Sequence, residues 1–195
     1  LNNLKYIYKK KFYILPFHLL IKSLFYYIEK VKTYINSEFL MCNLKIIKAS
    51  NKHSRKIWTW RNDPLSSEMS KMQNKISFED HSYWFKNILL DETKKIYVGE
   101  ELNVPLGVIR FEQSNNDSKA YNISINVAPM IRGKGFGKRF LNKSIEIFKK
   151  EENKCRYLFA YIKKKNISSQ KLFESCRFLN LSKEDIFTYR YDLFE

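Results

Sequence analysis

A strand, a glycine-rich turn and a helix follow one another in residues 120–150, and this segment constrains the fold more than any other. Residues 120–127 alternate between apolar and polar side chains, which indicates a strand with one buried face. Residues 136–150 carry apolar side chains at helical spacing, which indicates an amphipathic helix. Such a segment predicts a sheet with a helix packed on it, which is an α/β arrangement.

The same alternation of strands and helices extends over residues 41–195, which we expect to form one domain. A first helix is expected to end before Pro64, because proline disfavours the helical conformation in the residue before it. Further strands are expected at residues 44–48, 95–99, 105–112, 157–162 and 187–193, and further helices at about 53–60, 77–88 and 168–176. The pattern predicts a mixed α/β sheet with helices on its faces.

Residues 1–40 differ in character and read as a basic, apolar extension. They hold seven Lys and two Glu among many Tyr, Phe, Leu and Ile. The most apolar stretch, residues 12–28, is interrupted by polar residues and a proline, so it lacks the run of about 20 apolar residues that a stable membrane span needs. Met41 stands where the domain-like pattern begins, so we expect a dispensable extension that is not part of the natural protein. A basic helix lying on a membrane surface is the alternative.

The net charge of +16 at pH 7 is spread along the chain, and its densest run is the three lysines at 163–165. A solvated basic surface accounts for this distribution better than a nucleic-acid site, which needs clustered charge. The three cysteines are odd in number and lack the spacing of metal ligands. These features indicate a cytoplasmic protein with reduced thiols, no metal and no nucleic-acid partner.

The turn at residues 132–138 has the properties of a phosphate-binding loop. Glycine stands at every second position of residues 133–137, which lets the backbone approach a ligand closely. Backbone N–H groups at the start of a helix bind anions. The spacing G-x-G-x-G differs from that of Walker-type loops and of the dinucleotide fingerprint. The sequence therefore predicts another kind of pyrophosphate cradle, with positive charge from Arg132, Lys134 and Lys138.

Two runs of residues resemble the signatures of the GNAT superfamily of N-acetyltransferases. The first is R-x-x-G-x-G at residues 132–137, which follows a V-x-P strand end at Val127. The second is the run at residues 166–178, which resembles N-x-x-S-x-x-L-Y-E-x-x-G-F. The resemblance covers about residues 44–193. It implies a GNAT-like, mostly antiparallel central sheet flanked by helices, acetyl-CoA as the acetyl donor, and no metal.

The resemblance also implies roles for individual residues. The pantetheine arm of acetyl-CoA would lie along Asn126 and Val127, and the Val127 N–H would polarise the thioester carbonyl. Asn166 would hydrogen-bond the far side of the arm. The implied acetyl-CoA contacts are Asn126, Val127, Arg132, Gly133, Lys134, Gly135, Phe136, Gly137, Lys138, Asn166, Ser169 and Phe173.

Departures from the family pattern bear on the chemistry. Phe173 stands where many relatives have the Tyr that would protonate the departing thiolate, but a thiol has a pKa of about 8.5, so CoA can leave without strong acid help. Arg177 replaces a glycine and is expected to alter the turn that follows. No carboxylate lies in residues 120–127, so the base that deprotonates the amine must come from elsewhere. The candidates are Glu112 and His81.

The acceptor is predicted from two further runs. Residues 58–64 (WTWRNDP) and 81–85 (HSYWF) resemble the subgroup that acetylates amino groups on nucleotide-linked deoxysugars, as in pseudaminic acid synthesis for flagellin glycosylation. Aromatic rings can stack on a uracil or sugar face, and Arg61 can pair with a diphosphate. The implied acceptor contacts are Trp60, Arg61, Asn62, Asp63, His81 and Trp84.

Three alternatives stay open at this point. A protein N-terminal acetyltransferase of the ribosomal-protein type shares much of the pattern. A non-catalytic acyl-CoA-binding regulator is suggested by Phe173 and by the strand without a carboxylate, and a nucleic-acid-binding module by the charge. We expect a monomer or homodimer that acetylates the 4-amino group of a UDP-linked deoxyamino sugar.

Overall fold

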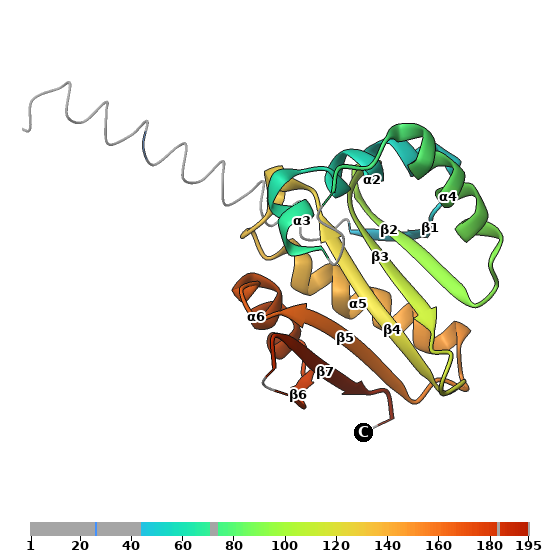
Figure 1. Cartoon of the computed structure of the whole chain (residues 1–195), viewed down its shortest axis with the longest axis vertical. Coiled ribbons are helices and arrows are strands. Elements are labelled where there is room, and N and C mark those ends of the chain that lie inside the picture. The colour runs from blue at the N-terminus through green and yellow to red at the C-terminus, as the bar shows by residue number, and fades with distance from the viewer. Residues whose placement is uncertain (1–25, 27–43, 71–73, 183, 195) are drawn as a thin grey trace, which may run out of the picture. The chain divides into compact units, whose positions relative to one another are not determined.

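A seven-stranded sheet forms the centre of the protein, in the order β1-β2-β3-β4-β5-β7-β6 (Figure 1). The computed structural model describes Tyr26 and residues 44–70, 74–182 and 184–194. The strands are β1 (Lys45–Lys48), β2 (Lys94–Glu101), β3 (Val104–Gln113), β4 (Ala120–Val127), β5 (Tyr157–Lys163), β6 (Leu179–Asn180) and β7 (Ile186–Asp192). All neighbouring strands pair antiparallel apart from β4 and β5, which are parallel. The expected mixed, mostly antiparallel sheet is confirmed.

Helices cover both faces of this sheet. They are α2 (Ser54–Arg61), α3 (Pro64–Met69), α4 (Phe78–Leu90), α5 (Phe136–Glu151) and α6 (Ile167–Ser175), with 3-10 turns η1 (Asn51–His53) and η2 (Pro129–Ile131). On β2, Tyr97 belongs to the apolar cluster of α5, whereas its neighbour Val98 belongs to the cluster of α2 and α4. Because successive strand residues point to opposite faces, α5 lies on one face and α2 with α4 on the other. Figure 1 shows α5 passing behind the strands.

The face covered by α5 carries the larger apolar core. The rings of Phe111 and Phe148 stack with centroids 4.1 Å apart, and Tyr121 meets Phe148 edge-on at 5.0 Å. Tyr121 and Ile123 both belong to this core, so the apolar face of β4 predicted from the alternation is confirmed. This core seats α5, and with it the glycine-rich turn that precedes α5.

Two of the three cysteines lie in the same core. Cys155 and Cys176 are buried and free. Burial raises the pKa of the Cys155 thiol to about 12 and also raises the pKa of Cys176. Both thiols therefore stay protonated and unreactive at neutral pH. Cys42 lies outside the described residues.

Two glycines let α5 approach the sheet. A Cβ on Gly99 would lie 2.8 Å from the Phe140 ring and 3.0 Å from Phe136, and a Cβ on Gly107 would lie 3.0 Å from both rings. Phe136 and Phe140 are themselves almost completely buried. The start of α5 is therefore held by aromatic rings that press directly on glycine backbone.

Replacing Gly99 with valine is expected to lower the free energy of unfolding by about 1–3 kcal/mol, because the added methyl groups overpack this contact. Chemical denaturation measures the loss. The Gly99→Ala variant, which adds one methyl group, should lose less. An unchanged denaturation midpoint for Gly99→Val would contradict the close packing of these rings.

The chain around Pro64 contains a helix that the sequence pattern did not predict. The helix α2 does end before this proline, at Arg61, but a further helix, α3, begins at Pro64 itself. The Asp63 carboxylate accepts a hydrogen bond from the Ser66 N–H at 3.2 Å, which caps α3. Asp followed by Pro is a helix-start signal, because proline is favoured at the first helical position. The pair therefore both ends one helix and starts the next.

The predicted extension at residues 1–40, and its boundary at residue 41, lie outside the described residues apart from Tyr26. Both stay predictions. Of the helices in the part of the chain that the structure describes, none is long and apolar enough to cross a membrane.

Candidate functional site

The parallel strands β4 and β5 pair only at one end. Their register joins Ala120 with Tyr157 and ends where Asn122 meets Phe159, whereas β3 stays paired with β4 as far as Val127. Figure 1 shows β4 and β5 diverging beyond this short contact. The second half of β4 therefore offers a free backbone edge along which an extended ligand can lie as a further strand.

The Val127 N–H points into this opening. The next residue, Ala128, donates its N–H to the Leu106 carbonyl at 2.8 Å, on the β3 side. Backbone groups of successive strand residues point in opposite directions, so the N–H of Val127 faces away from β3. This is the place where the predicted oxyanion-type contact would be needed.

The glycine-rich turn leads from β4 into α5. Gly133 and Gly135 adopt positive φ angles of 75° and 77°, and Gly135 is the N-cap of α5. Glycine is the residue that takes this conformation without strain. Because Gly135 has no side chain, it cannot cap the N–H groups in the first turn of α5. These N–H groups are therefore available to a ligand that binds in front of the helix. Lys134 and Lys138 are exposed beside them, and such an arrangement of N–H groups and positive charge can bind an anion.

Contacts with α6 close the other side of the opening. A Cβ on Gly137 would lie 3.4 Å from Leu172 of α6 and 3.8 Å from Val127, so α5 approaches both elements closely. The Asn166 side chain accepts the Ser169 N–H at 3.2 Å and caps α6. These two residues, predicted to contact acetyl-CoA, thus lie at the start of α6.

Phe173 is buried and packs edge-on against Phe178, with ring centroids 4.8 Å apart. The turn after α6 differs from our expectation. Arg177 has a φ of 69°, which is the left-handed conformation that a glycine would favour at this position, and the Phe178 N–H reaches back to the Phe173 carbonyl at 3.1 Å. Arginine therefore leaves the turn intact.

The predicted acceptor residues fall into different environments. Trp60 is 5% exposed and packs in the core between α2, α4 and the sheet, so its ring is not open to stacking in this structure. The Asn62 amide makes two hydrogen bonds with the Ile76 backbone, at 2.8 and 2.9 Å, and so anchors the residues before α4. Arg61 reaches Ser67 of α3 at 3.4 Å, and burial lowers the pKa of its guanidinium. Asp63 caps α3 and pairs with Arg132 at 2.6 Å.

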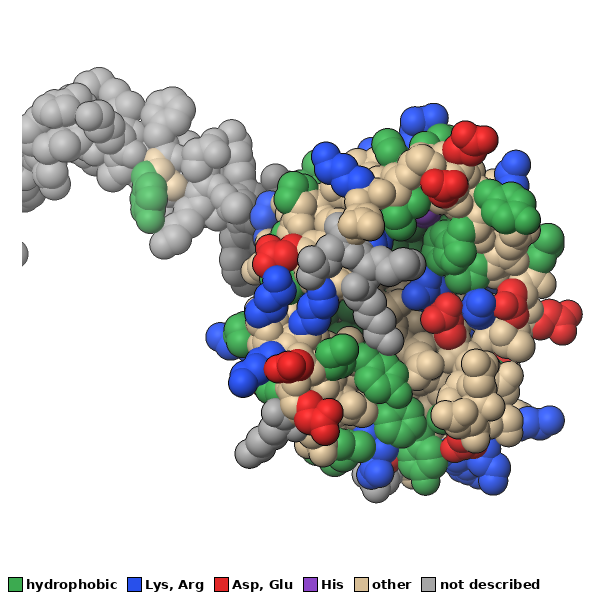
Figure 2. All heavy atoms as spheres, in the orientation of Figure 1, with side chains coloured by type: hydrophobic (Ala, Val, Ile, Leu, Met, Phe, Trp, Pro, Cys, Tyr) green, Lys and Arg blue, Asp and Glu red, His purple; other side chains and the backbone are tan. Residues whose placement is uncertain are grey.

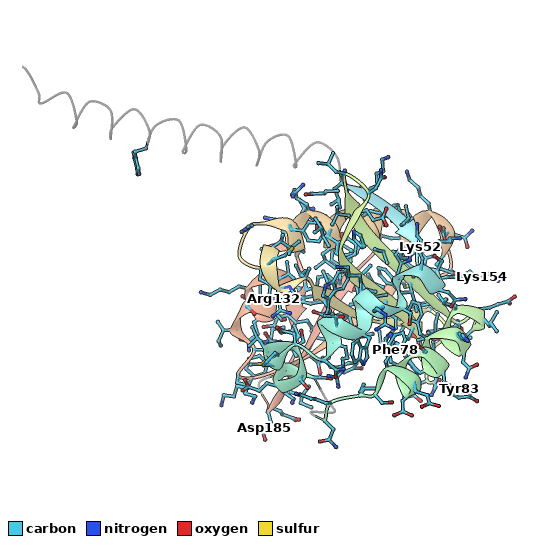
Figure 3. All side chains as sticks on the ribbon, turned by 90° about the horizontal axis from the view of Figure 1, so that it is seen from above. Lys52, Phe78, Tyr83, Arg132, Lys154 and Asp185 are labelled. Carbon is cyan, nitrogen blue, oxygen red and sulfur yellow. The ribbon has the colours of Figure 1, made fainter. Side chains whose placement is uncertain are left out.

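Trp84 is the predicted aromatic contact that remains open. It is 40% exposed, and the Arg110 guanidinium lies 5.5 Å from its ring centroid. Tyr83 is 73% exposed and sits at the outer edge of α4 (Figure 3). The exposed ring can stack on a planar group, and the guanidinium beside it can pair with an anionic group.

The two candidate bases differ in position and state. Glu112 is opposite Asn122 in the β3–β4 register and pairs with Arg110 at 3.3 Å. Val127 lies five residues beyond Asn122, so about 17 Å of strand separates Glu112 from the thioester position. Direct proton transfer to Glu112 would therefore need a chain of waters.

His81 is 2% exposed and stacks on Phe85 at 5.6 Å. Burial lowers the pKa of its imidazole, against a hydrogen bond with the Ser54 backbone that raises it, so the ring is neutral at pH 7. Among the described residues, none is a hydrogen-bond partner of its Nε2. The described residues also contain no group of three or more His, Cys, Asp or Glu that could hold a metal ion.

The sequence model of the Acetyltransferase (GNAT) family matches residues 55–178, which is more than half of the chain. The chain belongs to the GNAT acetyltransferase family. The expected GNAT-like fold and the expected activity, N-acetyl transfer with acetyl-CoA as the co-substrate, are confirmed.

Curated relatives and solved structures agree with this GNAT assignment. Two proteins named acetyltransferase PseH, from Campylobacter jejuni serotypes O:2 and O:23/36, are 29% and 30% identical to this chain. The alignments span 68% and 63% of this chain, and 81% and 74% of theirs. A spermidine N-acetyltransferase from Vibrio cholerae, solved with CoA and spermine, superposes with a TM-score of 0.70 at 16% identity, over 78% of this chain and 96% of its own. The acetyltransferase yncA from Salmonella typhimurium, solved with acetyl-CoA, has a TM-score of 0.67 at 20% identity, over 78% and 95%.

Ser66 and Arg110 lie at the candidate site and were not predicted from the sequence. Ser66 follows an unrecognised helix start, and the Asp63-Pro64 pair was the signal that could have revealed it. Arg110 lies opposite Ser124 of β4 and therefore shares the polar face of that strand. Reading β3 for alternation would have placed Arg110 beside Glu112 on this face.

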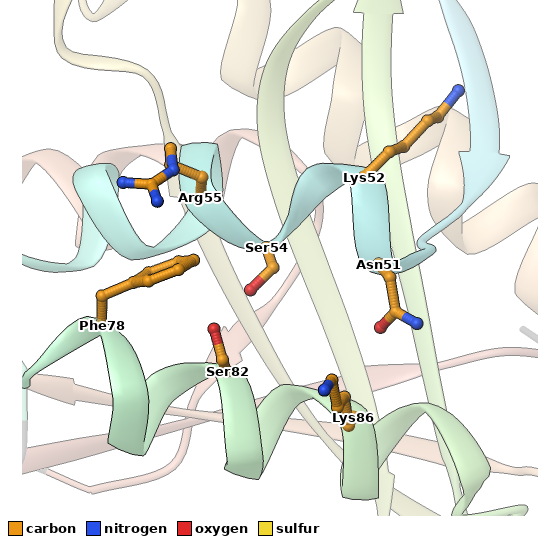
Figure 4. A pocket seen from close by; sticks show the side chains of 7 residues that line it. All are labelled: Asn51, Lys52, Ser54, Arg55, Phe78, Ser82 and Lys86. Carbon is orange, nitrogen blue, oxygen red and sulfur yellow. The ribbon is translucent and has the colours of Figure 1, made fainter.

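Other hollows and patches lie outside this site. A groove of about 320 Å³ runs between α2 and α4, where Arg55 lies over the Phe78 ring and the hydroxyls of Ser54 and Ser82 point toward each other (Figure 4). Its lining contains no residue of β4 or of the glycine-rich turn. Apolar side chains gather over β5 on the face seen in Figure 2. Two tyrosines of this strand, Tyr157 and Tyr161, are exposed.

Proposed function

We propose that this GNAT enzyme transfers the acetyl group of acetyl-CoA to the 4-amino group of a UDP-linked deoxyamino sugar. The likeness to two PseH acetyltransferases carries the choice of acceptor. The pseudaminic acid pathway, which supplies sugars for flagellin glycosylation, is the corresponding cellular role. A cytoplasmic monomer or homodimer fits a reaction between two soluble substrates.

The donor side of the proposal uses the opening between β4 and β5. The N–H groups at Gly135 to Lys138 would bind the pyrophosphate, with Lys134 and Lys138 adding charge from the exposed side. The pantetheine arm would pair with the free edge of β4 near Asn126. The Val127 N–H, which faces this opening, would then hydrogen-bond the thioester oxygen as negative charge develops on it.

The acceptor side uses the polar face of β4 and the helices above it. Trp84 is exposed and can stack on a sugar or uracil face, while the neighbouring Arg110 can neutralise a phosphate. Arg61 keeps the diphosphate role that the resemblance implies. The neutral state of His81 is the one that a general base requires, and Glu112 would act through water.

An acceptor panel tests this proposal. Release of CoA thiol from acetyl-CoA is measured with a UDP-4-amino-sugar, with peptides starting in Ala or Ser, and with spermidine. We expect kcat/KM for the nucleotide sugar to exceed that for the other amines at least about tenfold. Preference for the peptides would support the N-terminal acetyltransferase instead. Saturable acetyl-CoA binding without turnover on any amine would support a non-catalytic role.

The Phe173→Tyr variant tests whether the departing thiolate needs an acid. Because a thiol has a pKa of about 8.5, kcat is expected to change less than about threefold. The new hydroxyl would be buried beside Phe178 and should lower the free energy of unfolding by about 1–3 kcal/mol. Steady-state kinetics and thermal unfolding measure the two effects. A rise in kcat of tenfold or more would show that acid assistance limits the natural enzyme.

A further inference from the structure

The Arg132 side chain makes three hydrogen bonds that lead away from the glycine-rich turn. Its Nε donates to the Val127 carbonyl at 3.0 Å, one terminal nitrogen donates to Asp63 Oδ2 at 2.6 Å, and the other donates to Ser66 Oγ at 2.8 Å. All three nitrogens thus have partners on β4 or on α3 and its cap. Arg132 is labelled in Figure 3.

The partners of Arg132 are also bonded to one another. Ser66 donates its hydroxyl to Asn126 Oδ1 at 3.2 Å, and its N–H bonds Asp63. The network therefore joins the cap of α3 to the two strand residues along which the pantetheine arm is proposed to lie. Planar guanidinium groups fix such geometry more tightly than an ammonium does.

The ion pair is charged at neutral pH and largely shielded from water. The side chains of Arg132 and Asp63 are 26% and 18% exposed. Burial alone would raise the pKa of Asp63, but the hydrogen bonds and charge of Arg132 and the Ser66 N–H outweigh it, so the pKa lies below its ordinary value. A short charge-assisted bond in this setting holds one relative position of α3 and β4.

A second contact ties α3 to the opposite side of the opening. Lys165 pairs with the Glu68 side chain at 2.7 Å, and Lys163 at the end of β5 donates to the Glu68 carbonyl at 3.0 Å. The side chains of Lys165 and Glu68 are 50% and 54% exposed, so this pair contributes little stability. The helix α3 thus bridges the diverging ends of β4 and β5. The Arg132 network is the stronger of its two attachments.

From these contacts we infer that Arg132 is a positioning residue that holds α3 of the acceptor side against the strand that presents the thioester, and that it does not bind the pyrophosphate. The inference refines the proposed acetyl-CoA placement and rests on it. The sequence pattern predicted that Arg132 contributes positive charge to the pyrophosphate cradle, and the positioning role replaces that prediction. Lys134 and Lys138 remain as the charged groups of the cradle.

The test compares Arg132→Ala, Asp63→Ala and the double variant with the natural protein. Each is expected to bind acetyl-CoA within about threefold of the natural affinity in calorimetry, and to lose kcat roughly tenfold, inside the hundredfold that a 1 Å displacement can cost. The double variant should lose less than the product of the two single losses, because the pair between Arg132 and Asp63 is already broken in each single variant. Arg132→Lys keeps the charge without the three directed bonds, so its kcat should stay low.

If Arg132 instead bound the pyrophosphate, the same experiment would give a different result. Arg132→Ala would then weaken acetyl-CoA binding at least tenfold, Asp63→Ala would not, and Arg132→Lys would restore binding. The matched control Lys138→Ala should show this phosphate pattern, with weaker acetyl-CoA binding. Either the phosphate pattern in Arg132→Ala or a natural kcat in Asp63→Ala would overturn the inference.

Hydrogen exchange separates this inference from the proposed function, because it needs no acceptor. Amide exchange in α3 should rise in both Arg132→Ala and Asp63→Ala, with α5 unchanged. If no amine supported turnover but α3 exchange rose in both variants, the proposed function would fail while the positioning role of Arg132 would stand. Unchanged exchange of α3 in either variant would reject that role.

Discussion

Replacing Gly135 with valine is expected to abolish measurable acetyl-CoA binding and to leave the rest of the domain folded. Gly135 has a φ of 77° at the N-cap of α5, and a β-branched side chain disfavours this conformation strongly. The turn must change shape, which redirects the N–H groups of the first helical turn. Losing two charge-assisted hydrogen bonds of about 1.5–3 kcal/mol each weakens binding at least about 100-fold.

The fold should survive because an ideal Cβ at Gly135 meets no atom within 4 Å. Calorimetry measures the affinity, and thermal unfolding measures stability. The matched control is Asn103→Val, which puts valine at another positive φ, 62° in the turn between β2 and β3. That variant should lose a similar stability and keep its acetyl-CoA affinity. Natural affinity in Gly135→Val would show that the phosphates bind elsewhere.

Replacing Val127 with proline is expected to lower kcat by about 100-fold to 1000-fold, the usual cost of removing one oxyanion donor. Proline lacks the N–H that faces the opening between β4 and β5, but its carbonyl can still accept the bond from Arg132. The pairing of β4 with β3 loses no hydrogen bond, because the Val127 N–H points the other way. Steady-state kinetics with a saturating amine measures the loss.

The control for this variant is Val127→Ala, which keeps the N–H and should retain kcat within about threefold. Acetyl-CoA affinity should stay within about threefold in both variants, because binding depends mainly on the turn before α5. Should Val127→Pro turn over at the natural rate, the thioester carbonyl must be polarised by another group.

Local patterns predicted the elements that surround the proposed donor site. The alternation of β4, the glycines of the turn and the apolar stripe of α5 each depend on neighbouring residues, and all three recur in the structure. The opening between β4 and β5 could not be predicted, because it depends on where two strands about 30 residues apart stop pairing. The family resemblance implied only that the pantetheine arm would lie along Asn126 and Val127, with Asn166 on its far side.

The acceptor side was harder because its residues have distant partners. Trp60 matched a motif, but its helical position turns it into the core of α2 and α4. Asn62 and Asp63 are engaged by Ile76 and Arg132, which no local pattern links to them. Glu112 lies one residue before the end of β3, close to the predicted strand end, yet only the β3–β4 register shows how far it lies from Val127.

The rings of Phe136 and Phe140, pressed against Gly99 and Gly107, have a consequence for how the cofactor is held. Phe136 is both the first residue of α5 and a member of the core, so the direction of the anion-binding amides is set by the interior of the protein. A larger side chain at Gly99 or Gly107 would displace these rings and tilt the N–H groups at the start of α5. Acetyl-CoA would then bind more weakly, although neither glycine is proposed to contact it. Conversely, bound acetyl-CoA should stabilise the folded state, so that changes at these glycines alter the melting temperature and the affinity for acetyl-CoA in the same direction.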